Sequence, residues 1–510
     1  MGPGSHRRIA RIGLVAGPVL AALAYLLPDA QLDASGEVIS GLTRAGQGAV
    51  AVGIVMAVWW LTEAIPLEAT GLLPIVLLPL TGALGLKPAA AAYANEVIFL
   101  FLGGMILGKA MEVWRLHERL ALGVVGAFGG RPALMVLGLL AATAFVSMWV
   151  SNTASAIMML PIAVSITRLV REHVRAAHGE GMDRQARDFA TAAALAVAYG
   201  ASIGGVGTLI GTPPTAQFAA FMRERMGIEV RFLEWIVLGA PLVLACVLVA
   251  WVVLVRLAVR VDLPPMRELA REIDHRRRAQ GPWNAGQRWV LAVFVMASSL
   301  WIVLPLLGSW SGVPESWRAP LARSGDAVVG VAAALLLFML PVGGKEPRRV
   351  LRWDEAQGVP WGVLLIFGGG LALADALKAS GADRFLASGT GALRGLPLPV
   401  LLLALNLACV FLSEVMSNTA LAIMGLQIAA PIAEKLGLPP AAVLVAVTLG
   451  SSLAFMLPAG TPPNAIAFTS GHVTGRQMAH AGVWLNIALA LVSTAVLLGA
   501  MTLGVLPGAR

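Results

Sequence analysis

The key run of this chain is Ser151-Asn152-Thr153-Ala154-Ser155-Ala156-Ile157-Met158, which returns 266 residues later as Ser417-Asn418-Thr419-Ala420-Leu421-Ala422-Ile423-Met424. A second run, Phe101-Leu102-Gly103-Gly104, returns at the same offset as Phe367-Gly368-Gly369-Gly370. A third, Gly211-Thr212-Pro213-Pro214, returns 249 residues later as Gly460-Thr461-Pro462-Pro463. Because their order and spacing agree, we interpret the chain as an internal duplication.

The composition is that of a membrane protein. Of the 510 residues, 58% are hydrophobic and only 13% are charged, whereas a soluble domain carries about 25% charged residues. Apolar windows long enough to cross a bilayer recur along the whole length. This pattern excludes an ordinary cytosolic enzyme. Cys246 and Cys409 both lie in apolar segments and indicate neither a disulfide framework nor a metal cluster.

The net charge of +9 does not indicate a nucleic-acid partner. The basic residues lie in short segments between apolar runs, not on one face of a soluble module. The positive-inside rule explains them better, with Arg276-Arg277-Arg278 in a cytoplasmic segment. We therefore expect an integral protein of the bacterial cytoplasmic (inner) membrane, with a cytoplasmic N-terminus and contacts to membrane lipid.

About eleven transmembrane helices are expected, since a span needs about 20 apolar residues. The first could instead be a cleavable signal peptide, but it lacks a clear small-residue cleavage site, and a retained helix is favoured. The expected spans are 10–28, 49–63, 67–86, 95–112, 189–210, 233–258, 287–307, 326–342, 359–378, 440–459 and 478–506.

Two further apolar stretches, 132–170 and 395–433, are each too short for two full crossings. The first is flanked by basic residues on both sides, Arg131 before it and Arg168 after it. Both of its ends should therefore lie on the cytoplasmic side. We interpret the two stretches as re-entrant helical hairpins, whose polar tips must face protein or a water-filled cavity because lipid cannot satisfy bare backbone.

The duplication predicts an all-α, polytopic membrane protein made of two inverted repeats. Each repeat holds five crossings, one hairpin and one broken helix, and an odd number of crossings turns the second repeat upside down. The hairpins then enter from opposite sides, and their tips can meet near the bilayer centre. Such a pattern is typical of a secondary transporter. The expected regions are an N-terminal helix and loop (1–48), repeat 1 (49–261, broken helix 189–225), a cytoplasmic linker (262–286) and repeat 2 (287–510, broken helix 440–470).

The doubled motifs have a chemical consequence if they converge. Alone, Ser-Asn-Thr and Thr-Pro-Pro are ordinary helix starts, because Ser and Thr cap helices and Pro is tolerated in the first turn. Four helix starts at one place would present free N–H groups and partial positive charge to a carboxylate or sulfate, without Lys or Arg. Carbonyl and side-chain oxygens at the same breaks suit Na⁺.

These motifs resemble those of the divalent anion:sodium symporter family, the sodium-coupled dicarboxylate, citrate and sulfate carriers, over roughly residues 50–505. The resemblance implies an elevator-type homodimer. It implies that the substrate is bound by Ser151, Asn152, Thr153, Ser417, Asn418, Thr419, Thr461 and Pro462. It also implies one sodium site at Ser147, Ser151, Asn152 and Gly211, and a second at Ser413, Ser417, Asn418 and Gly460.

The function expected from these observations is Na⁺-coupled symport of a divalent anion, such as the C4-dicarboxylates succinate, malate and fumarate, with Na⁺ as the coupling ion. A sodium-independent dicarboxylate or citrate exchanger and a sulfate carrier remain open alternatives. An intramembrane enzyme would need an acid/base or metal constellation at the centre, which we do not find in the sequence. A channel suits two opposed hairpins less well than alternating access does.

Glu414, Thr215 and the segment 111–128 carry further expectations. Glu414 follows Ser413 and could tune a cation site, carry a proton or accept hydrogen bonds from neighbouring groups. Thr215 stands where the second repeat has Asn464, so the outer edge of the first half-site is undecided. Residues 111–128 are expected to form a helix along the cytoplasmic surface.

Overall fold

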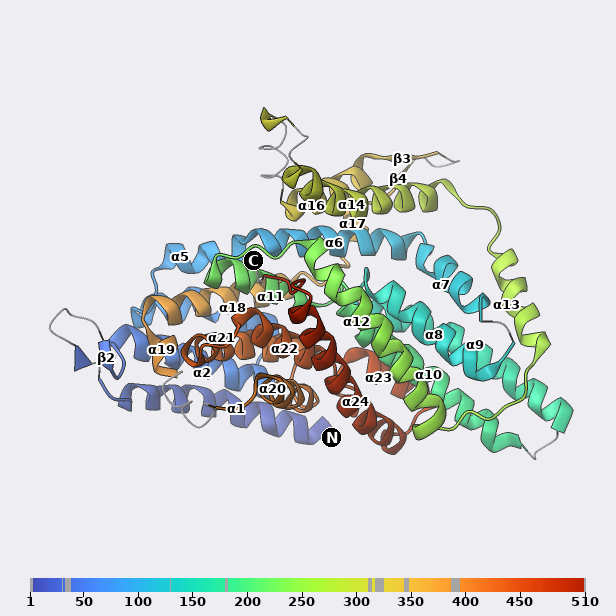
Figure 1. Ribbon diagram of the computed structural model, residues 1–510, viewed down its shortest axis with the longest axis horizontal. Helices are drawn as coiled ribbons and strands as arrows, with labels where there is room; N and C mark the ends of the chain where they lie inside the picture. The colour runs from blue at the N-terminus through green and yellow to red at the C-terminus, as the bar shows by residue number, and fades with distance from the viewer. Residues whose placement is uncertain are drawn as a thin grey trace.

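The computed structural model describes residues 3–29, 31–32, 38–128, 130–178, 182–310, 314–316, 325–343, 348–386 and 395–508. Parts of the expected regions 1–48, 49–261 and 287–510 therefore lie outside the described residues. Within these ranges the regular secondary structure is helical, apart from two small antiparallel ribbons (Figure 1). The ribbons pair β1 (Gln31–Leu32) with β2 (Val38–Ser40), and β3 (Pro341–Val342) with β4 (Arg348–Arg349).

The helices fall into two sets along the chain. The first set comprises α1 (Pro3–Leu23), η1 (Ala24–Leu26), α2 (Arg44–Thr62), α3 (Leu67–Thr70), α4 (Leu73–Thr81), α5 (Leu86–Ala91), η2 (Ala92–Ala94), α6 (Glu96–Val113), α7 (Leu116–Gly126), α8 (Pro132–Ser147), α9 (Asn152–His178), α10 (Asp183–Gly205), α11 (Pro213–Met226), α12 (Phe232–Val252) and η4 (Val253–Ala258). The second set comprises α13 (Arg267–Ala279), α14 (Ala285–Ser309), α16 (Asp326–Met339), α17 (Trp353–Ala356), α18 (Gly362–Ala379), α19 (Ala382–Leu386), α20 (Leu398–Ser413), α21 (Asn418–Leu436), α22 (Pro440–Ser452), α23 (Pro462–Thr469) and α24 (Gly475–Thr502).

Within the described residues, nine helices are long and apolar enough to cross a membrane, instead of the eleven spans expected. The chain is therefore an all-helical, polytopic membrane protein. The expected span 67–86 is split, because α3 ends at Thr70 and α4 begins at Leu73. Helix α16 has only 14 residues and α22 only 13. In contrast, α9 and α21 are long enough to cross, and α9 runs past the expected hairpin end at 170 to His178.

The two sets repeat the same packing. Helix α10 packs against α8 and α9, and α22 packs against α20 and α21 in the same way. The sets also interlock, because α9 packs against α23 and α21 packs against α11. Each helix that begins with a Ser-Asn-Thr run thus lies beside the helix that begins with the Thr-Pro-Pro run of the other set.

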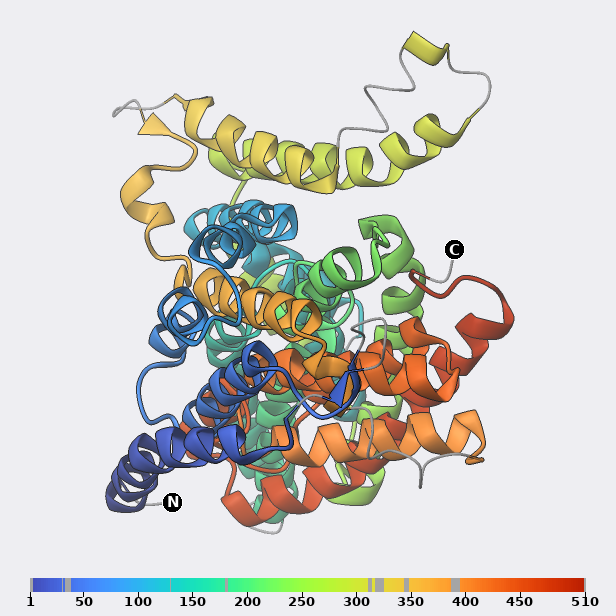
Figure 2. The same cartoon turned by 90° about the vertical axis from the view of Figure 1, so that its left-hand side faces the viewer.

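Glycines allow the closest helix crossings, as is common where lipid supplies no hydrophobic drive for association. At Gly103 of α6, an added Cβ would lie 2.5 Å from the backbone carbon of Gly330 in α16. At Gly369 of α18, it would lie 2.2 Å from the carbonyl oxygen of Gly71. Helices α6, α16 and α18 are therefore held backbone to backbone with their neighbours, and α14 with α16 forms an outer layer over α6 (Figure 2).

The surface helix expected at 111–128 is α7, which starts after Arg115 in a left-handed conformation (φ 51°). Its Arg119 donates to the carbonyl oxygens of Gln280 (2.9 Å) and Gly281 (2.6 Å) and lies over the ring of Trp283. Helix α7 is thus fastened to the segment that joins the two halves of the chain.

Candidate functional site

The first polar tip lies between α8 and α9. Helix α8 ends at Ser147 and α9 begins at Asn152. The Ser147 hydroxyl donates to the carbonyl oxygen of Ala201 at 2.7 Å and lies 2.9 Å from Oδ1 of Asn152. The tip is therefore fastened to α10, which carries Ala201.

The second polar tip repeats this geometry. Helix α20 ends at Ser413 and α21 begins at Asn418. The Ser413 hydroxyl lies 3.3 Å from Oδ1 of Asn418. Each tip is therefore spanned by a serine on the first leg and an asparagine at the start of the second.

The first broken helix interrupts the chain between Gly205, the last residue of α10, and Pro213, the first of α11. A Cβ at Gly205 would lie 2.3 Å from Oδ1 of Asn152. A Cβ at Gly211 would lie 2.4 Å from the carbonyl oxygen of Gly205 and 3.1 Å from that of Met148. Side-chain and backbone oxygens thus crowd around two glycines, which is a donor set that fits a hard cation.

The second broken helix lies between α22, which ends at Ser452, and α23, which begins at Pro462. Glu414 fills this break. Its Oε1 accepts from the backbone N–H groups of Phe455 (2.7 Å) and Met456 (2.9 Å) and from the amide of Asn486 (2.8 Å), and its Oε2 accepts from the N–H of Leu457 (3.0 Å). Of the roles expected for Glu414, the geometry favours that of hydrogen-bond acceptor, because its carboxylate pairs with backbone N–H groups that lipid could not satisfy.

Thr215 and Asn464 make the same contact. The Thr215 hydroxyl lies 3.1 Å from the carbonyl oxygen of Thr208, and the Asn464 amide donates to that of Leu457 at 3.0 Å. Thr208 and Leu457 correspond at the 249-residue offset. The shorter Thr215 side chain therefore binds a backbone carbonyl of the first break, as the Asn464 side chain does in the second.

Contacts between α9 and α23 and between α21 and α11 place each Ser-Asn-Thr helix beside a Thr-Pro-Pro helix of the other half. Among the described residues, no hydrogen bond joins one Ser-Asn-Thr run to the other. The expected binding residues differ in exposure. Ser151 and Pro462 are exposed, Asn152, Thr153, Ser417, Asn418, Thr419 and Gly460 are half-buried, and Ser147, Gly211, Ser413 and Thr461 are buried.

The two tips are not equally covered. Ile157 in α9 and Ile423 in α21 correspond in the repeat, yet the first side chain is 56% exposed and the second 5%. Ile423 is covered by α18, where a Cβ at Gly370 would lie 2.7 Å from it. In the described part of the chain, no comparable packing joins α9 to α6, the counterpart of α18. The structure therefore covers α21 beside its tip with α18 and leaves the corresponding part of α9 exposed.

Ion pairs fasten the end of α11 on the closed side. Arg223 pairs with Glu96 at the start of α6, and Arg225 pairs with Asp383 in α19. The side chains of Arg225 and Asp383 are both more than nine-tenths buried. These residues were not predicted from the sequence, although charges directly after an apolar run indicate a helix end that meets other chain segments.

The sequence matches the family described as the sodium:sulfate symporter transmembrane region over residues 37–506. The chain belongs to this family, the divalent anion:sodium symporters. The resemblance seen in the doubled motifs is therefore confirmed, and the family is one of transporters and not of enzymes.

Two relatives in the symporter family carry a more specific name. The chain is 36% identical over 483 residues to the sodium-dependent dicarboxylate transporter SdcS of Staphylococcus saprophyticus, covering 93% of this chain and 88% of the relative. It is also 36% identical over 482 residues to the protein of that name from Staphylococcus aureus, covering 94% and 89%.

Two solved structures share the fold of this symporter. MtrF of Neisseria gonorrhoeae has a TM-score of 0.56 at 15% identity, over 96% of this chain and 94% of that chain. The YdaH transporter of Alcanivorax borkumensis has a TM-score of 0.57 at 15% identity, over 98% of each chain. At this identity the likeness concerns the fold alone.

Proposed function

We propose that this chain is a sodium-coupled symporter of a C4-dicarboxylate, such as succinate, malate or fumarate, in the bacterial cytoplasmic membrane. The names of two relatives that are 36% identical over more than nine-tenths of the chain support the substrate and the coupling ion. The observation that carries the proposal is the doubled set of polar helix starts, interlocked across the two halves.

The anion site needs no basic side chain. Helices α9, α21, α11 and α23 begin at Asn152, Asn418, Pro213 and Pro462, so the partial positive charge of each start lies at the polar region, and α9 and α21 add free N–H groups that the proline starts of α11 and α23 lack. The hydroxyls of the Ser-Asn-Thr runs add donors. Ser151, Asn152, Thr153, Ser417, Asn418, Thr419, Thr461 and Pro462 would hold the two carboxylates.

Sodium would be held at each tip. The first site comprises Ser147, Ser151, Asn152 and Gly211, beside the oxygens that crowd Gly205 and Gly211. The second comprises Ser413, Ser417, Asn418 and Gly460, where a Cβ at Gly460 would lie 2.9 Å from Oε2 of Glu414 and 3.3 Å from the carbonyl oxygen of Leu457. Both donor sets consist of oxygen atoms, the ligands that suit Na⁺. Bound Na⁺ would add positive charge that attracts the dianion.

The unequal exposure of α9 and α21 beside the two tips supports an alternating-access cycle. We call α8–α11 and α20–α23 the moving group, and α2, α6, α16 and α18 the frame. The positive-inside distribution places the end of α11 outside and the tip at Ser151 toward the cytoplasm. On this orientation, the proposal assigns the arrangement to a cytoplasm-facing state, in which the moving group is closed against the frame on the outer side. The cycle moves this group as one body, in an elevator motion within a homodimer, and the two repeats are related by inversion.

The test is uptake of labelled succinate into proteoliposomes. An inward sodium gradient should drive accumulation, and Asn152→Ala or Asn418→Ala should abolish it. Counterflow driven by a dicarboxylate gradient with no sodium requirement would replace symport by exchange. Preferential competition by sulfate would replace the dicarboxylate by a sulfate cargo.

A further inference from the structure

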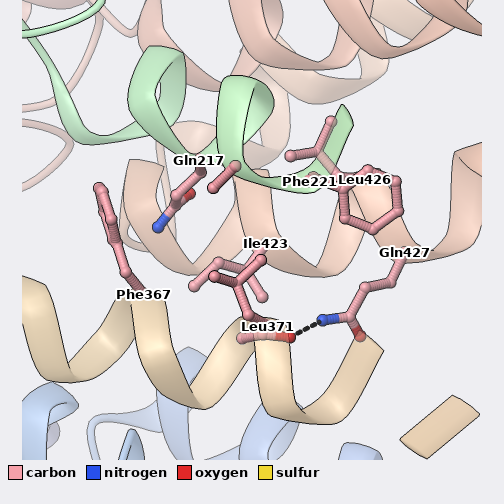
Figure 3. A pocket seen from close by; sticks show the side chains of 9 residues that line it. Gln217, Phe221, Phe367, Leu371, Ile423, Leu426 and Gln427 are labelled. Carbon is pink, nitrogen blue, oxygen red and sulfur yellow. Dashed lines mark hydrogen bonds between the residues drawn. The ribbon is translucent and has the colours of Figure 1, made fainter. Parts of the chain in front are cut away.

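A small cavity lies where α11, α18 and α21 meet (Figure 3). Its volume is about 10 Å³, room for about one water molecule. The lining is apolar except for two amides, Gln217 from α11 and Gln427 from α21. Figure 3 shows Gln217 pointing from α11 toward the space between Phe367 and Ile423.

The two amides differ in how they are satisfied. Gln427 donates to the carbonyl oxygen of Gly370 at 2.8 Å (Figure 3). Gln217 is 4% exposed, yet neither its Nε2 nor its Oε1 has a hydrogen-bond partner among the described residues. A buried, unpaired amide destabilises the arrangement that contains it. The Gln217 side chain is therefore suited to a partner that this closed arrangement does not supply.

The position of Gln217 indicates which partner that is. Gln217 lies five residues beyond Thr212, the N-cap of α11, which is about 7.5 Å along the helix from the polar centre. Ile423 lies five residues beyond Asn418 on α21. Both helices belong to the moving group, whereas α18, on the other side of the cavity, belongs to the frame. In the proposed cycle, an anion that reaches the centre from outside would pass where these helices separate.

We propose that Gln217 is an entry contact for the transported anion, donating a hydrogen bond from Nε2 to a carboxylate of the dianion when α11 and α21 part from α18. This inference rests on the proposed function and adds a residue to the route that leads to its site. A neutral amide suits a transient contact, because it attracts a carboxylate without the strong hold of a lysine or arginine. A water molecule can take the same place while the seam is closed.

Two variants test the proposal, Gln217→Leu and Gln217→Met, which remove both polar atoms while keeping most of the volume. We expect kcat/KM for sodium-driven succinate uptake to fall about tenfold, the usual effect of losing a hydrogen bond to a charged group. We expect the unfolding temperature of the purified protein to stay equal to the wild-type value or rise, because an unpaired amide has been removed. The matched control is Gln427→Leu, which loses the bond to Gly370 and should lower the unfolding temperature.

The outcomes are distinct. If both Gln217 variants keep kcat/KM within twofold of the wild type, the cavity holds water only and the inference is overturned. If uptake and unfolding temperature fall together in both variants, Gln217 is a structural residue and the inference is again overturned. Failure of the wild type itself to take up succinate would instead reject the proposed function, on which this inference rests.

Discussion

The rings of Phe101 and Phe367, which occupy the same position in the two repeats, lie 5.3 Å apart between centroids. Two residues related by a two-fold axis can touch only where that axis passes. If the two halves are related as the proposed inverted repeats, their axis passes between α6 and α18. Away from this contact, equivalent residues of the two repeats differ in solvent exposure, and chemical labelling can measure that difference.

Ile157→Cys and Ile423→Cys are expected to differ in their reaction with a thiol reagent that does not cross membranes. Ile157 is exposed and Ile423 is covered by α18. In inside-out vesicles, the cysteine at 157 should react quickly and the one at 423 slowly. Cys246 and Cys409 are buried and should add little background. Equal rates would contradict a state closed on the outer side.

Reversing one charge of the Arg225–Asp383 pair should destabilise the closed state. Arg225→Asp alone, or Asp383→Arg alone, leaves two like charges facing each other in a buried place, at a cost of about 3 kcal/mol. The unfolding temperature should fall in each single variant and recover in the double variant. Arg352→Ala is the control, because Arg352 and its partner Asp354 are both exposed. A double variant as unstable as the singles would show that the pairing does not matter.

Glu414→Ala should be strongly destabilising. It leaves the N–H groups of Phe455, Met456 and Leu457 without their acceptor, and each unsatisfied buried group costs about 1–3 kcal/mol. Glu414→Gln keeps an acceptor oxygen and should be milder. Unfolding temperature is the readout. If Glu414→Ala left stability intact but removed a pH dependence of uptake, the carboxyl group would be a proton carrier instead.

Gly205→Ala should weaken sodium binding at the first tip. The added methyl group would lie 2.3 Å from Oδ1 of Asn152 and must push that oxygen aside. We expect the sodium concentration for half-maximal uptake to rise about tenfold or more, as it does when a ligand loses its orientation. Gly123→Ala, where nothing lies within 4 Å of the new Cβ, is the control. An unchanged sodium dependence would remove Asn152 from the sodium site.

Stability should fall as the pH drops below about 6.5, in part because of His117. Burial lowers the pKa of this side chain in α7 below its ordinary value of 6.5. The unfolded chain then binds a proton at a pH where the folded one does not, so acid favours unfolding. The loss of unfolding temperature between pH 7 and pH 5 should be smaller in His117→Gln. A loss of the same size in that variant would assign the effect to another group.

The sequence predicted the features that depend on local pattern. The doubled runs placed the starts of α9 and α21 at Asn152 and Asn418 because a cap followed by an apolar run begins a helix wherever it stands. The number of membrane spans was predicted wrongly where the length of a helix does not match the length of its apolar part. Helix α16 is apolar but short, and α9 continues past its apolar part into charged residues up to His178.

Features that depend on distant contacts could not be predicted. The acceptor role of Glu414 depends on N–H groups more than 40 residues away and on Asn486 in another helix. The lack of a hydrogen-bond partner for the Gln217 amide and the ion pair of Arg225 with Asp383 depend on how α11 packs against α18 and α19. No periodicity in one segment contains such information.

The carboxylate at 414 also makes the membrane voltage relevant to the empty carrier. Its two oxygens accept four N–H bonds, which fix the side chain within the second break. In the proposed cycle it travels with the moving group, so each unloaded return shifts one negative charge through part of the electric field. A full crossing is worth about 2.3 kcal/mol per 100 mV. A cytoplasm that is electrically negative would therefore push the unloaded group outward and speed its reset for the next uptake.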